Sequence, residues 1–146
     1  MQKTINSLLK GTSRSFYLTL KALPSKVRSQ IGLGYLLARI SDTIADSIRG
    51  SAIQRLEALE HYNDRIQNRR NTLPSLANLA KLQHNPAEAE LLEKAATPVA
   101  YLEEFSNTDQ QFIRRVLDII ISGQTLDIQR FSNANSNSIV SLNKEE

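Results

Sequence analysis

Residues 33–46 read LGYLLARISDTIAD, and the spacing of their apolar and polar side chains decides the fold. On a helix that advances about 100° per residue, Tyr35, Arg39, Asp42 and Asp46 fall within an arc of about 60°. The opposite side of that helix is apolar and carries Leu33, Leu36, Leu37, Ile40, Ile44 and Ile48. This pattern predicts an amphipathic α-helix whose apolar side faces a core.

Asp42 and Asp46 are four residues apart, close to one helical turn, so we expect their Cβ atoms about 5–6 Å from each other. Two carboxylates at this spacing repel unless positive charge lies near them. A divalent cation supplies such charge, and Mg²⁺ typically takes one or two carboxylates together with the phosphates of a substrate. An ordinary solvated helix side, with an ion pair between Arg39 and Asp42, has the same spacing, so both interpretations stay open.

The rest of the chain also favours helices, and it shows neither β alternation nor a repeat of fixed period. After a short opening segment, we expect helices over residues 13–20, 24–49, from 51 to a break at 71–74, 75–83, 86–94 and 108–131. Ser13, Ser51 with Gln54, and Thr108 with Gln111 are the expected N-terminal caps. Residues 132–138 predict a polar loop, and residues up to 146 the start of another helix. The short connections predict an all-α fold, an antiparallel helical bundle forming a single domain.

Composition excludes several classes of protein. The chain has 146 residues, 40% of them hydrophobic and 23% charged, which is typical of one soluble globular domain. It has no cysteine, and its two histidines, His61 and His84, have no potential metal ligand at a suitable spacing, so we expect no disulfide and no zinc site.

Charge and hydropathy limit the cellular locations and the binding partners that we expect for the chain. The net charge of +3 is mild and aromatic residues make up only 5% of the chain, so we expect no nucleic-acid binding. No apolar segment reaches the 18–20 residues or so that a membrane span needs, and no signal peptide is visible. We therefore expect a cytoplasmic protein, with peripheral contact to an anionic membrane surface as its closest association with lipid.

Two parts of the sequence resemble the squalene and phytoene synthase family. Residues 13–17 (SRSFY), 22–24 (ALP), 35–39 (YLLAR) and 42–46 (DTIAD) follow the order and spacing of its first substrate-binding region. There, a Ser-Arg-Ser-Phe-like segment precedes a long helix with a Tyr, an Arg and the first Asp-x-x-x-Asp motif. Residues 123–127 (GQTLD) are similar to a Gly-Met-x-x-Asp helix that often lines the family's pocket, with Gln124 in place of Met. The resemblance implies the N-terminal part of an isoprenoid-synthase-type fold.

The resemblance also implies an activity, the head-to-head coupling of two prenyl diphosphates, most commonly farnesyl diphosphate, with loss of diphosphate. Asp42 and Asp46 would hold Mg²⁺, and Arg39 would clamp the diphosphate with its planar guanidinium. Tyr35 would bond a phosphate oxygen, assist proton transfer or shield a carbocation with its ring, although a tyrosine at the rim of the core fits the sequence equally well. NADPH would be needed only if the product is of the squalene type, which the sequence does not indicate.

The remaining candidate residues bind substrate in this interpretation. Arg14 and Ser15 would meet the second diphosphate near a helix start. Phe16 and Tyr17 would line an apolar prenyl tunnel. The resemblance assigns Gly123, Gln124 and Asp127 to the pocket wall, although one acidic residue on a polar helix side is more often simply solvated.

The largest departure of the chain from the family pattern is that a second Asp-x-x-x-Asp motif is absent from its 146 residues. We therefore expect an incomplete N-terminal piece of a longer synthase, inactive by itself and prone to self-association through exposed apolar surface. The alternative is a noncatalytic helical module that binds a partner or a membrane surface and leaves its acidic stripe solvated.

Overall fold

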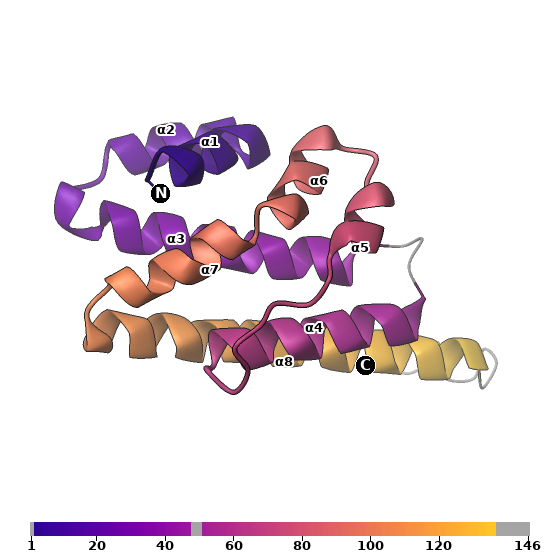
Figure 1. Cartoon of the computed structure of the whole chain (residues 1–146). Coiled ribbons are helices and arrows are strands. Elements are labelled where there is room, and N and C mark those ends of the chain that lie inside the picture. The colour runs from indigo at the N-terminus through magenta and orange to yellow at the C-terminus, as the bar shows by residue number, and fades with distance from the viewer. Residues whose placement is uncertain (1, 48–50, 137–146) are drawn as a thin grey trace.

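The computed structural model of the chain describes residues 2–47 and 51–136 (Figure 1). Within these ranges the chain is helical and contains no strand, which confirms the all-α fold class. The elements are α1 (Gln2–Thr12), α2 (Arg14–Lys21), α3 (Ser25–Ala45), α4 (Ala52–Ile66), α5 (Ala77–Lys81), α6 (Pro86–Glu93), α7 (Ala96–Tyr101), the 3₁₀ helix η1 (Leu102–Glu104) and α8 (Asn107–Ser136).

The helix α3 lies at the centre of the molecule and packs against α1, α2, α4, α6, α7 and α8. α4 runs antiparallel to both α3 and α8, and α1 and α2 cover the end where α3 begins (Figure 1). The predicted apolar side of α3 is fully buried at Leu33, Leu36, Leu37, Ile40 and Ile44, each 0% exposed. Ile48 lies outside the described residues. Because this side is buried against several helices, the opposite side of α3 is the part that is free for a site. We call this opposite side, which carries Tyr35, Arg39, Asp42 and Asp46, the polar stripe.

Three of the helix starts follow the caps that their sequences favour. The Ser13 hydroxyl accepts a hydrogen bond from the N–H of Phe16 at 3.2 Å, and Ser51 accepts one from Gln54 at 3.0 Å. Asn85 caps α6 in the same way, with Pro86 as the first helical residue. Each cap satisfies an N–H group that has no partner inside its helix, which fixes where α2, α4 and α6 begin.

The helix α3 ends earlier than predicted, at Ala45 and not near Arg49, and Asp46 is its C-cap. Ser47 explains the early end, because its hydroxyl donates to the Thr43 carbonyl at 2.7 Å and accepts from the Gln83 amide at 2.8 Å. The second of these hydrogen bonds connects Ser47, after α3, to Gln83, which lies between α5 and α6. Residues 48–50 lie outside the described part of the chain.

Other helix boundaries also differ from the predictions. α1 replaces the expected opening segment, and it buries Ile5, Leu8 and Leu9 in the core. α5 is shorter than predicted, and α7 contains Pro98, which is tolerated because it lies in the first turn, where no helical N–H bond is required.

The predicted start and end of the last helix were both wrong. α8 begins at Asn107, and Ser106 rather than Thr108 provides the cap by accepting from the N–H of Asp109 at 3.2 Å. Residues 132–136, predicted to be loop, continue α8, because extending an existing helix costs little even through polar residues of low propensity. Residues 137–146 lie outside the described part.

Candidate functional site

The polar stripe of α3 carries the two aspartates one turn apart, as its spacing predicted. The N–H of Asp46 donates to the carbonyl oxygen of Asp42 at 2.8 Å, so the helical spacing continues through the C-cap. Asp42 is half-buried and Asp46 is exposed. The pair thus combines one carboxylate that is fixed by its surroundings with one that is open to solvent.

Asp42 is held from α8 by Gln124. The Nε2 atom of Gln124 donates to Oδ1 of Asp42 at 2.5 Å. The Oε1 atom of Gln124 is buried and has no hydrogen-bond partner among the residues that the structure describes. Because α8 packs along α3, this bond joins the 42–46 stretch to the 123–127 stretch. Gly123 and Asp127 lie beside Gln124 in the sequence of α8 and are exposed.

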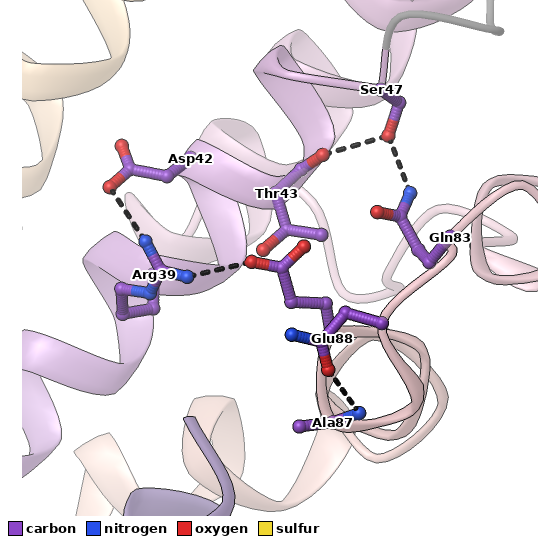
Figure 2. Close-up of polar contacts among 8 residues, drawn as sticks. Arg39, Asp42, Thr43, Ser47, Gln83, Ala87 and Glu88 are labelled. Atoms are coloured by element: carbon purple, nitrogen blue, oxygen red, sulfur yellow. Dashed lines mark hydrogen bonds and ion pairs between the residues drawn. The ribbon is translucent and has the colours of Figure 1, made fainter. Parts of the chain in front are cut away.

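Arg39 lies between two carboxylates (Figure 2). Its Nη2 atom is 2.8 Å from Oε2 of Glu88, and its Nη1 atom is 3.8 Å from Oδ2 of Asp42. The Arg39 and Glu88 side chains are only 28% and 31% exposed. Arg39 Nε is buried and has no hydrogen-bond partner within the described part of the chain. The guanidinium is therefore oriented by Glu88 on α6 and still lies within reach of Asp42.

The surroundings of Asp42 shift its acidity. Burial raises the pKa of the Asp42 carboxyl above its usual range. The positive charge of Arg39 lowers that pKa, the negative charge of Asp46 raises it, and the hydrogen bond from Gln124 lowers it. The upward effects prevail, so the ionised form of Asp42 is less favourable here than in water, and a cation bound at the pair would stabilise it.

An apolar groove begins beside the stripe. The rings of Phe16 and Tyr35 are stacked with their centroids 4.0 Å apart and their planes at 20°. Both rings line a cavity of about 310 Å³ between α2, α3 and α8, whose other apolar walls include Ile31, Phe112 and Val116. Phe16 on α2 and Tyr35 on α3 therefore lie together next to an apolar space, and Tyr35 is on the same helix as Arg39 and Asp42.

The comparison with protein families decides the classification. The family model described as squalene/phytoene synthase matches residues 9–140. The chain belongs to this family. No significant match was found among curated proteins or among solved structures.

Membership in the squalene/phytoene synthase family confirms the resemblance that the motifs indicated, and it places the chain in a family of prenyltransferases. The matched range contains residues 13–17, 35–46 and 123–127, so every motif used in the sequence interpretation lies inside it. Among the described residues, no helix has the length and apolar character required to cross a membrane.

Some candidate residues of this squalene/phytoene synthase family member lie away from the polar stripe of α3. Tyr17 lines a different cavity, with Lys10 and Lys21 over its ring. Ser15 is exposed, and its carbonyl accepts a hydrogen bond from Thr19 at 3.0 Å. Arg14 begins α2, but its side chain lies outside the described part of the chain.

Asp42 and Asp46 could hold a magnesium ion only if water or phosphate oxygens completed its coordination shell. No group of three or more His, Cys, Asp or Glu residues that could hold a metal occurs in residues 2–47 and 51–136. Two carboxylates alone leave most of an octahedral shell for water and phosphate oxygens, which is the usual state of protein-bound Mg²⁺. Asp46 is exposed and available, and the carboxylate of Asp42 is oriented by Gln124.

Sequence reasoning missed Glu88. The Asn85-Pro86 start signal places Glu88 in the first turn of α6, but no sequence signal pairs it with Arg39, 49 residues away. Only the packing of α6 against α3 brings the two side chains together.

Proposed function

We propose that the α3 stripe binds the diphosphate of a prenyl diphosphate together with Mg²⁺, as one part of a head-to-head prenyltransferase of the squalene or phytoene synthase type. The observation that carries the proposal is the hydrogen bond between Gln124 and Asp42, which joins two family motifs at one place. The helices α3 and α8 would then form one wall of the pocket.

In this proposal the aspartates of the polar stripe bind the metal ion, and its arginine binds phosphate in a fixed orientation. Bound Mg²⁺ would neutralise the departing diphosphate, held by Asp42 and Asp46. Arg39 would bind a phosphate oxygen with the guanidinium that Glu88 orients, since arginine donates two parallel hydrogen bonds to phosphate. A guanidinium held in place before binding loses less conformational freedom when the ligand arrives.

The apolar groove suits the prenyl tail. Phe16 and Tyr35 form a stacked aromatic wall, and an aromatic face also stabilises a nearby carbocation by about 0.5–2 kcal/mol. Farnesyl diphosphate is the substrate we propose, and NADPH would take part only in a squalene-type reaction. We also propose that this chain alone completes no turnover, because it has only one Asp-x-x-x-Asp pair. Detection of coupled prenyl product from the purified chain would contradict that part of the proposal.

The binding proposal can be tested by thermal unfolding with Mg²⁺ and inorganic diphosphate. A ligand that binds only the folded chain raises its melting temperature. We expect the increase in wild type and its loss in the Asp42→Asn, Asp46→Asn double variant. The matched control is Glu57→Gln, Glu93→Gln, which removes two exposed charges elsewhere and should keep the increase.

Two further results bear on the same proposal. Farnesyl diphosphate should raise the melting temperature more than inorganic diphosphate does, because its tail would bury apolar surface in the groove. The absence of any magnesium-dependent increase, or an equal increase in all three proteins, would favour a noncatalytic helical module with a solvated acidic stripe.

A further inference from the structure

The net positive charge of the chain lies in residues 1–41. Residues 1–41 contain no Asp or Glu, and their basic residues are Lys3, Lys10, Arg14, Lys21, Lys26, Arg28 and Arg39. All 15 acidic residues of the chain lie in residues 42–146, together with the remaining 11 of its 18 basic residues. The net charge of +3 is therefore the sum of a basic part, residues 1–41, and an acidic part, residues 42–146. Such asymmetry indicates an anionic partner for the basic part.

A cavity in this basic part provides a place for an anion. It has a volume of about 310 Å³ and lies between α1, α2 and the first turns of α3. Leu9 and Leu20 contribute apolar surface, whereas Lys21 and Arg28 contribute positive charge. None of the described residues that line it is Asp or Glu. The cavity thus combines an apolar side with cationic side chains.

Within residues 2–47 and 51–136, the cations around this cavity are not paired with acidic side chains. The Nζ atoms of Lys10 and Lys21 lie 5.1 and 5.3 Å from the centroid of the same Tyr17 ring. Among the described residues, no carboxylate lies within ion-pair distance of Lys10, Lys21 or Arg28. Like charges gathered around one ring repel each other within the Debye length, about 10 Å. A bound anion would relieve that repulsion.

Arg28 is already oriented at the cavity. Its Nη2 atom donates to the carbonyl oxygens of Leu23 at 2.8 Å and Lys21 at 3.3 Å. These bonds hold one end of the guanidinium at the turn between α2 and α3 and leave other N–H donors for a ligand. Ser25, the first residue of α3, also lines the cavity, and Pro24 provides no side-chain cap. The positive end of the α3 dipole therefore adds to the field of the cations.

We propose that this cavity binds a phosphate group, either the head of an anionic phospholipid or a soluble phosphate ester. The site is separate from the stripe, because Ser25 and Asp42 are about 25 Å apart along the axis of α3. Its apolar side, next to its cations, suits a phosphate that carries an apolar substituent. The proposal does not depend on magnesium, on the two aspartates or on prenyl transfer.

The test is thermal unfolding with inorganic phosphate in the presence of EDTA, at constant ionic strength. Removing divalent cations keeps the α3 stripe out of the measurement. We expect phosphate to raise the melting temperature of the wild type, and Lys21→Gln to weaken phosphate binding about tenfold, the effect of losing one charge-assisted hydrogen bond. The matched control is Lys81→Gln, because Lys81 is an exposed lysine at the end of α5 and does not line this cavity.

A second measurement separates the two sources of phosphate. Sedimentation with phosphatidylglycerol–phosphatidylcholine vesicles that is lost in Lys21→Gln and kept in Lys81→Gln would support the proposal and identify a lipid head group. A Lys21-dependent effect of free phosphate without vesicle binding would support it and identify a soluble ester. The absence of both effects, or equal effects in Lys21→Gln and Lys81→Gln, would overturn the proposal.

Discussion

The Gln124 amide on α8 donates a hydrogen bond of 2.5 Å to the Asp42 carboxylate on α3, across 82 residues of sequence. This bond connects the acidic pair to α8, which packs against α3. It favours the ionised form of Asp42 in a place where burial disfavours that form. The helix α8 therefore influences both the orientation and the charge of a proposed magnesium ligand.

Gln124→Met should raise the pKa of Asp42 further. Methionine fills a similar volume and matches the residue that the family often carries, but it donates no hydrogen bond to the carboxylate. The pKa is measured by NMR titration of the Asp42 carboxyl carbon. Gln111→Met, an exposed substitution on the same helix, is the control and should leave that pKa unchanged. An unchanged pKa in Gln124→Met would show that the hydrogen bond is absent in solution.

Asp42→Asn should stabilise the chain at neutral pH. The pKa of Asp42 is raised in the folded state, so folded chains bind the proton more tightly than unfolded chains do. The stability of the wild type therefore falls as pH rises from the unfolded pKa through the folded pKa, and it stays lower above that range. We expect the variant to melt on the order of 1–2 °C higher at pH 7. The increase is small because solvent screens this part-exposed group.

Two melting curves at different pH values test the sign of this effect. The difference between wild type and Asp42→Asn should vanish below the unfolded pKa, where both side chains are neutral. A variant that is less stable than the wild type at pH 7 would contradict the prediction, and it would mean that the attraction to Arg39 outweighs burial.

Glu88→Gln should lower the free energy of unfolding by about 1 kcal/mol, because it leaves the partly buried Arg39 guanidinium without its closest anion. The matched control is Glu90→Gln, also on α6, which breaks a 2.8 Å ion pair with exposed Lys94. That exposed pair should contribute less, because water and salt screen it. Urea denaturation measures both variants. Equal losses would mean that the Arg39–Glu88 pair behaves like an ordinary surface pair.

Phe112→Ser combined with Ile119→Ser should reduce self-association. Phe112 and Ile119 are 68% and 66% exposed, and their spacing of seven residues places them on one face of α8. Large exposed apolar side chains that share a face favour association in water. Sedimentation velocity over a range of concentrations measures the effect. The control is Ile53→Ser, which removes an exposed isoleucine from α4. An unchanged degree of association would exclude this face of α8.

Local rules predicted much of the fold. The side of α3 that is buried follows from a period of 3.6 residues, and the starts of α2, α4 and α6 follow from caps only two or three residues away. The boundaries that were missed depend on distant contacts. α3 stops at Ala45 where Ser47 meets Gln83, which lies 36 residues farther along the chain. α1 is stabilised by burying apolar side chains against other helices, which its own short sequence does not indicate.

By itself the sequence determined the all-α class, the family and the face of α3 that carries Tyr35, Arg39, Asp42 and Asp46, because all three depend on residue type and spacing within a few helical turns. The tertiary structure alone decided that Gln124 holds Asp42 and that Glu88 holds Arg39. Those pairs join helices far apart in the chain, and side chains at such separations meet only when packing of the apolar faces has fixed how the helices lie.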